Sequence, residues 1–149
     1  MPTARPHRRS VLAGLVSFAT IGQARADQPL LTFDELYGKV SVLGLSFSDR
    51  VKALAGGSVR MRGFMAPPLK AEADFFVLTE IPMSLCPFCS SDADWPDNIV
   101  VVYLGRKQTF VQANAVIEVE GVLDYGSWTD PATGFVSLLR LRDANFRTV

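Results

Sequence analysis

Residues 58–65 read Ser-Val-Arg-Met-Arg-Gly-Phe-Met, and this stretch decides the class of the fold. The apolar side chains of Val59 and Met61 alternate with Arg60 and Arg62, which is the period of a half-buried strand. Later runs rich in β-branched, aromatic and aliphatic residues predict four more strands, at residues 74–81, 98–104, 115–123 and 135–141. Five short strands with no long helix among them predict a mainly β fold, and a five-stranded OB-like barrel fits best.

Two short helices are expected before the first strand. Thr32 can cap a helical turn at residues 32–37, and Ser48 can cap a second helix at residues 47–55. A pair of glycines at positions 56 and 57 predicts the end of that second helix. Residues 27–149 contain no repeat and no linker, and their length suits one hydrophobic core, so we expect a single OB-like domain.

Alternation also predicts which strand residues face outward. Glu118 and Glu120 alternate with apolar residues, so we expect a solvent-facing pair rather than a catalytic one. Arg60 and Arg62 are expected on the exposed side of the first strand, where two aligned arginines could hold an anionic ligand. Three glycines are expected at bulges or turns: Gly121, Gly126 and Gly134.

Residues 1–26 have the anatomy of a secretory signal peptide. A basic region containing Arg8 and Arg9 precedes a short apolar stretch, and Ala24 and Ala26 form a small-x-small cleavage site. The arginine pair directly before a weakly hydrophobic stretch favours export by the twin-arginine route. The apolar stretch is too short to span a bilayer. We therefore expect a periplasmic protein that does not span the membrane after cleavage before Asp27.

Charge and composition exclude several function classes. The chain has 15 basic and 15 acidic residues, and residues 1–26 hold four of the arginines and no acid, so the exported part has a formal charge of −4. An acidic protein is a poor partner for nucleic acid or an anionic membrane surface. The single histidine, His7, lies in the signal peptide. Without it, histidine-dependent nucleophilic catalysis is excluded, and we expect no enzyme activity.

The candidate site is the segment that carries both cysteines, Cys86 and Cys89. Two thiolates three positions apart can bind one zinc or copper(I) ion. Asp92 or Asp94 could add an oxygen ligand for zinc, and Met83 could add a thioether for copper(I). A structural zinc site needs four ligands, which a homodimer could supply. This segment lies between the second and third predicted strands, at the rim of the expected barrel.

Two other uses of Cys86 and Cys89 remain open. The sequence Cys-Pro-Phe-Cys is also that of glutaredoxin-like active sites, so the pair could exchange electrons as a thiol–disulfide couple. In an oxidising compartment the pair could instead form a local structural disulfide in a non-catalytic interaction module. The surrounding pattern does not predict the βαβ units of a thioredoxin fold.

The chain resembles a family of uncharacterised bacterial periplasmic proteins with OB-like domains. The likeness rests on residues 59–69, on Phe-Val-Leu at residues 76–78, on the cysteine-containing segment and on the run at residues 96–102, and it extends over residues 47–142. Members of that family are often encoded beside ABC transporters of the macrolide-exporter type and are linked to metal homeostasis. The resemblance therefore implies a β-barrel accessory protein with a membrane transporter component as partner. The family's commoner segment has one cysteine followed by histidine and prolines, whereas this chain has Cys86-Pro87-Phe88-Cys89.

Overall fold

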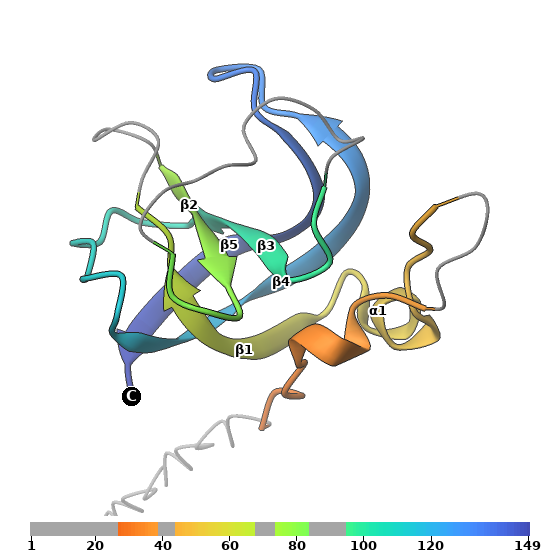
Figure 1. The fold of residues 1–149 in the computed structure, drawn as a ribbon, viewed down its shortest axis with the longest axis horizontal. Coiled ribbons are helices and arrows are strands. Elements are labelled where there is room, and N and C mark those ends of the chain that lie inside the picture. The colour runs from red at the N-terminus through yellow and green to blue at the C-terminus, as the bar shows by residue number, and fades with distance from the viewer. Residues whose placement is uncertain (1–26, 39–43, 68–73, 84–94) are drawn as a thin grey trace, which may run out of the picture.

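The structure is a computed structural model that describes residues 27–38, 44–67, 74–83 and 95–149. It is mainly β, with five strands and few helices (Figure 1). The elements are the 3₁₀ helix η1 (Phe33–Glu35), the helix α1 (Asp49–Leu54), and the strands β1 (Ser58–Met65), β2 (Phe75–Thr79), β3 (Ile99–Leu104), β4 (Val116–Thr129) and β5 (Val136–Thr148). No helix in these described ranges is long and apolar enough to cross a membrane.

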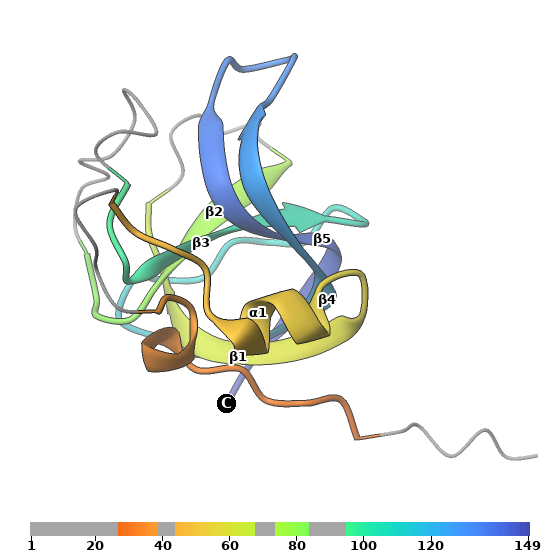
Figure 2. The same ribbon diagram turned by 90° about the vertical axis from the view of Figure 1, so that its right-hand side faces the viewer.

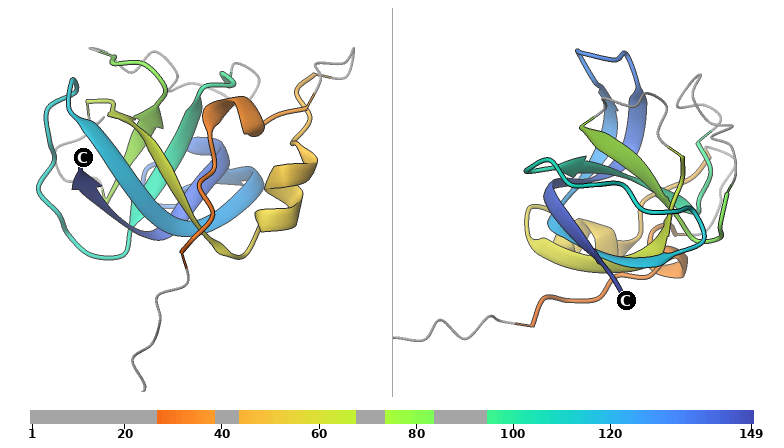
Figure 3. Two further views of the ribbon diagram at one scale, coloured as in Figure 1. Left: turned by 90° about the horizontal axis from the view of Figure 1, so that it is seen from below. Right: turned by 90° about the vertical axis from the view of Figure 1, so that its left-hand side faces the viewer.

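The five strands form one sheet that closes into a ring in the order β1-β2-β3-β5-β4 (Figure 3). β4 returns to β1, where Ser58 to Phe64 pair with Val122 to Val116. All neighbouring strands are antiparallel except β3 and β5, which run parallel. Because every strand has two neighbours, the sheet leaves few of its backbone groups at an open edge.

The core fills the inside of this ring. β1 shows the predicted alternation, with Val59 and Met61 fully buried between half-buried or exposed arginines. β2 is buried at every position. Phe76 packs edge-on against Phe146 of β5, with ring centroids 5.4 Å apart. This burial of large apolar side chains is the main stabilising term of the domain.

β4 and β5 are longer than the sequence predicted. The expected strands ended at residue 123 and began at residue 135, whereas the two strands of the structure form a hairpin that projects beyond the ring (Figure 2). Gly126 has a φ of 106° within a register shift of β4, so the strand bends there without ending. Arg140, which is buried, donates to the carbonyl oxygen of Gly126 at 2.9 Å and to the carboxylate of Asp124 at 3.0 Å.

The N-terminal segment and α1 lie against the ring, as Figure 2 shows for α1. Ser48 caps α1 as predicted, because its hydroxyl accepts from the N–H of Val51 at 3.0 Å. Gly56 follows with a φ of 80°, and its N–H donates to the carbonyl of Leu123 on β4. Earlier in the chain, the N–H of Leu31 donates to the carbonyl of Arg60 at 2.8 Å, which docks residues 27–31 on β1.

Replacement of Gly63 by alanine should destabilise the domain strongly. A Cβ atom at this position would lie 2.5 Å from the carbonyl oxygen of Thr79, where β1 meets β2. We expect a loss of about 3 kcal/mol in the free energy of unfolding, because overpacking forces the backbone to shift. Urea denaturation measures this loss.

Gly38→Ala is the matched control for that experiment. Its Cβ would meet the hydroxyl oxygen of Ser46 at 3.2 Å, and that side chain can rotate away. A loss below about 1 kcal/mol is therefore expected. Equal losses for the two variants would contradict the close approach at Gly63.

Candidate functional site

The cysteine segment connects two neighbouring strands, as the sequence predicted. β2 ends at Thr79 and β3 begins at Ile99, so residues 80–98 form the connection. The structure describes this connection up to Met83 and again from Trp95. The predicted ligands and the predicted signal-peptide residues lie outside the described ranges: Cys86, Cys89, Asp92, Asp94, Arg8, Arg9, Ala24 and Ala26.

The two ends of the connection are hydrogen-bonded to each other and to the ring. The N–H of Glu80 donates to the carbonyl of Asn98 at 3.2 Å, which extends the β2–β3 pairing by one bond. The hydroxyl of Thr79 donates to the carbonyl of Ile81 at 2.7 Å and thereby turns the chain away from β2. Met83, the predicted thioether ligand, is half-buried on this side of the connection.

Trp95 fixes the second end of the connection. Its side chain is buried, and its indole N–H donates to the hydroxyl oxygen of Tyr37 at 2.7 Å. Burial, partly offset by this hydrogen bond, raises the pKa of Tyr37 to about 12, so the phenol stays protonated at neutral pH. The ring of Tyr37 stacks on Phe47 at 5.6 Å between centroids, and Phe47 contacts Tyr125 of β4 at 5.0 Å.

A small depression lies beside these two ends. It has a volume of about 190 Å³, and three of its lining side chains are the acids Asp34, Glu80 and Asp97. In the described ranges, however, no three cysteine, histidine, aspartate or glutamate residues are grouped closely enough to hold a metal ion. A metal site here would therefore need ligands from residues 84–94. The remaining lining residues are Phe33, Tyr37, Gly38, Leu45 and Asn98.

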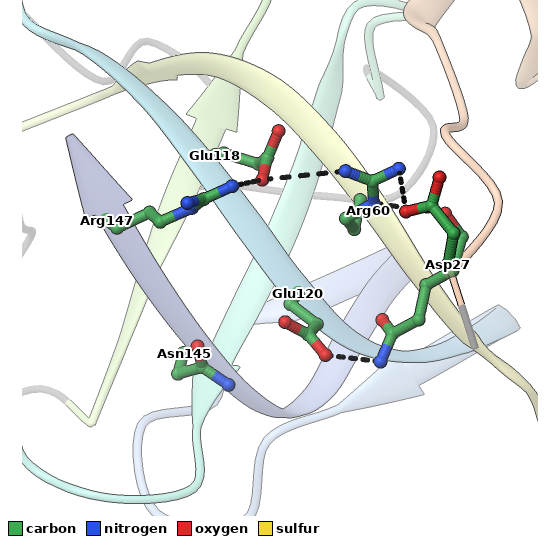
Figure 4. A pocket seen from close by; sticks show the side chains of 7 residues that line it. Asp27, Arg60, Glu118, Glu120, Asn145 and Arg147 are labelled. Carbon is green, nitrogen blue, oxygen red and sulfur yellow. Dashed lines mark hydrogen bonds and ion pairs between the residues drawn. The ribbon is translucent and has the colours of Figure 1, made fainter. Parts of the chain in front are cut away.

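A second polar feature lies on the outer face of β1, β4 and β5. Glu118 was expected to face solvent, and this prediction is wrong, because only 4% of the residue is exposed. Its carboxylate accepts from Arg62 at 2.8 Å. It also accepts from Arg147, and Arg60 lies 3.8 Å away (Figure 4). The side chain does point outward, as alternation predicted, but arginines from both neighbouring strands cover it.

The charges around Glu118 keep it ionised. Hydrogen bonds from Arg147 and then Arg62 hold the pKa of the carboxyl below its usual range, although burial acts in the opposite direction. Asp27 pairs with Arg60 at 2.9 Å, and the amide of Gln28 donates to Glu120. Arg147 was not predicted as a partner of Glu118, because the fifth predicted strand ended at residue 141 and the cross-strand pairing of Glu118 with Arg147 lies beyond it.

The comparisons with known proteins support the fold alone. No protein-family model and no curated protein sequence matches this chain. The crystal structure of a DUF3299 family protein from Pseudomonas aeruginosa PAO1 is similar, with a TM-score of 0.53 and 14% sequence identity. The similarity covers 82% of this chain and 96% of that chain. At this level of identity the match indicates a shared arrangement of strands.

Removing the hydroxyl of Tyr37 should loosen the end of the connection at Trp95. In Tyr37→Phe the buried indole N–H loses its acceptor, and an unpaired buried donor costs about 1–3 kcal/mol. We expect that loss in urea unfolding, together with a shifted tryptophan emission. Tyr125→Phe is the control, because it removes a hydroxyl from a tyrosine that is exposed. If both variants unfold at the same urea concentration, the Trp95–Tyr37 bond does not hold the connection.

Glu118→Gln should destabilise the domain at neutral pH by roughly 1–3 kcal/mol, because the arginines lose their anionic partner near a solvent-screened surface. The pKa of Glu118 is lowered on folding. Its contribution is therefore complete above the unfolded-state pKa of about 4.3 and disappears as the pH falls through the lower folded-state pKa.

The free energy of unfolding, measured from about pH 7 down to pH 2, tests this sign. The native protein should lose stability more steeply with acid than Glu118→Gln does. Glu80→Gln, a change at an exposed acid, should follow the native profile. Parallel profiles for all three proteins would mean that Glu118 is not held ionised by the arginines.

Proposed function

We propose that this protein is an exported, non-catalytic accessory protein that binds a zinc or copper(I) ion through Cys86 and Cys89. The observation that carries the proposal is the attachment of the cysteine segment. Both of its ends are held, one by the Glu80–Asn98 hydrogen bond next to the β2–β3 pairing and the other by the Trp95 hydrogen bond to Tyr37 of the N-terminal segment. A segment whose ends are fixed pays less conformational entropy when two of its side chains converge on one ion.

The ligand chemistry follows from the residue types in the segment. Thiolates are strong ligands for both zinc and copper(I), and the spacing of two residues between Cys86 and Cys89 lets both sulfurs reach one ion. The position of Met83 at the described end of the segment favours copper(I), which accepts thioether sulfur. Zinc would instead draw on Asp92 or Asp94, or on the cysteines of a second copy in a homodimer.

We further propose that the domain is an OB-like barrel that serves a membrane transporter in the periplasm. The closed five-stranded ring and its projecting β4–β5 hairpin support the barrel. The twin-arginine pattern in residues 1–26 and the family resemblance across residues 47–142 support the compartment and the partner. An accessory protein of this kind would pass its ion to the transporter or sense it there, and neither step needs a catalytic group.

Metal content and free thiols, measured on protein isolated from the periplasm without chelator, test the proposal. We expect about one zinc or copper ion per one or two chains, and loss of that ion in the Cys86→Ser/Cys89→Ser variant. Asp92→Asn/Asp94→Asn should lower the content only if the ion is zinc, and Met83→Leu only if it is copper(I). These two variants serve as controls for each other, since each leaves the cysteines in place.

The same measurement separates the rival uses of the cysteines. If the protein holds no metal and its cysteine pair stays oxidised in a glutathione buffer, the pair is a structural disulfide and not a metal site. Protein without metal whose pair is readily reduced and reoxidised in that buffer would indicate a thiol–disulfide role. Either result would overturn the proposed metal site.

A further inference from the structure

A larger depression than the one beside the cysteine segment's two described ends lies on the outer face of β1, β4 and β5. It has a volume of about 430 Å³, and none of its lining residues belongs to the connection at residues 80–98 (Figure 4). Side chains from three strands and from the N-terminal segment meet in it. The lining residues are Asp27, Gln28, Arg60, Glu118, Glu120, Asn145 and Arg147.

The floor of the depression is unusually charged. Glu118 is buried beneath arginines, and a buried ion pair is weak evidence for stability, because apolar residues of similar volume often stabilise a fold as well or better. The network therefore suggests a binding role. A lining made almost entirely of hydrogen-bonding groups fits a small polar ligand rather than an apolar one.

One wall of the depression offers hydrogen-bond donors. The carboxylate of Glu118 accepts from one guanidinium nitrogen of Arg147 and so holds its side chain in place, while 70% of that side chain remains exposed. A guanidinium carries five N–H donors, so others remain for an anion. The amide of Asn145 lies on the same strand, two residues earlier. An oriented guanidinium beside an amide is suited to a carboxylate.

Other residues of the lining offer acceptors. Asp27 and Glu120 bring negative charge to the lining, and Glu120 is the cross-strand partner of Asn145. The amide nitrogen of Gln28 donates to Glu120. The amide oxygen of Gln28 is buried, and it has no hydrogen-bond partner in the described part of the chain. That oxygen is buried too deeply for a ligand in the depression to reach it. The carboxylates of Glu120 and Asp27 remain to attract an ammonium group, and Asp27 also pairs with Arg60 at 2.9 Å.

We propose that this depression binds a small zwitterion, an amino acid or a short peptide, with its carboxylate at Arg147 and Asn145 and its ammonium at Glu120 and Asp27. Glu118 is a positioning residue in this site, because it orients Arg147 and does not itself face the ligand's carboxylate. The site uses none of the cysteine-segment residues, so it stands or falls independently of the metal proposal.

Calorimetric titration of the purified protein with alanine and with alanyl-alanine tests the site. One of the two should bind saturably, at about 1 mM or tighter. N-acetylation, which removes the ammonium, and C-terminal amidation, which removes the carboxylate charge, should each weaken that binding about tenfold or more. The stronger binder of the unblocked pair identifies the source as a free amino acid or as a peptide.

Variants confirm the location. Glu120→Gln should weaken binding of the unblocked ligand about tenfold and leave binding of its N-acetylated form unchanged. Asn145→Ala should lower affinity without affecting the Glu118 network, since Asn145 makes none of that network's hydrogen bonds. Asp49→Asn on α1, an exposed acid that does not line the depression, is the control and should bind normally.

Absence of saturable binding by either ligand up to about 10 mM would overturn the proposal. Binding that ignores both blocking groups, or that Glu120→Gln and Asn145→Ala leave intact, would also overturn it. Because metal content is measured on the same preparations, failure here is distinguishable from failure at Cys86 and Cys89.

Discussion

The close approach of β1 and β2 at Gly63 is the constraint on which the rest of the fold depends. β1 pairs with β4 along Ser58 to Phe64 and reaches β2 only at its last two residues, so the ring passes from one partner to the other at this point. The carbonyl of Thr79 lies so near Gly63 that a side chain there would collide with it. Thr79 also ends β2 and turns the chain into the cysteine segment. The crossing that closes the sheet thus also sets where the candidate metal segment begins.

The sequence predicted those parts of the fold that local patterns determine. β1 has the bounds that alternation gave, and α1 begins after its predicted cap, Ser48. The β4–β5 hairpin was predicted too short, because the glycines, aspartates and proline of residues 124–134 are typical of a turn between strands. A bulge or turn was expected at Gly126, and the register shift there agrees with a bulge. In the structure the bend at Gly126 is held within the strand by Arg140, a residue from the partner strand. A contact with a residue of another strand leaves no pattern in the local sequence. The alternation of apolar and polar residues therefore stops before the strand itself ends.

For the polar sites too, local sequence patterns predicted some features and not others. The location of the cysteine segment between two strands could be predicted, because the second and third predicted strands lie before and after it. The structure describes the two ends of this segment. The environment of Glu118 could not be predicted, because alternation gives the face of a sheet on which a side chain lies and not what covers it. Its cover comes from β1 and from Arg147, which is 29 positions later in the chain. The pairing of residues across neighbouring strands determines which side chains cover Glu118. That pairing depends on the strand register, which was not predicted from the sequence.

The N-terminal segment contributes lining residues to both of the depressions described above. Asp27 and Gln28 line the depression on the outer face, while Tyr37 lines the depression beside the cysteine segment and accepts a hydrogen bond from Trp95. Between them the chain is bound to Arg60, whose backbone pairs with residues 29 and 31 and whose side chain donates to the carbonyl of Gln28 at 3.0 Å. One residue of β1 therefore anchors the backbone that serves both places. Because Arg60 also lies 3.8 Å from Glu118, this one residue belongs both to the charged network of the outer face and to the attachment of the N-terminal segment.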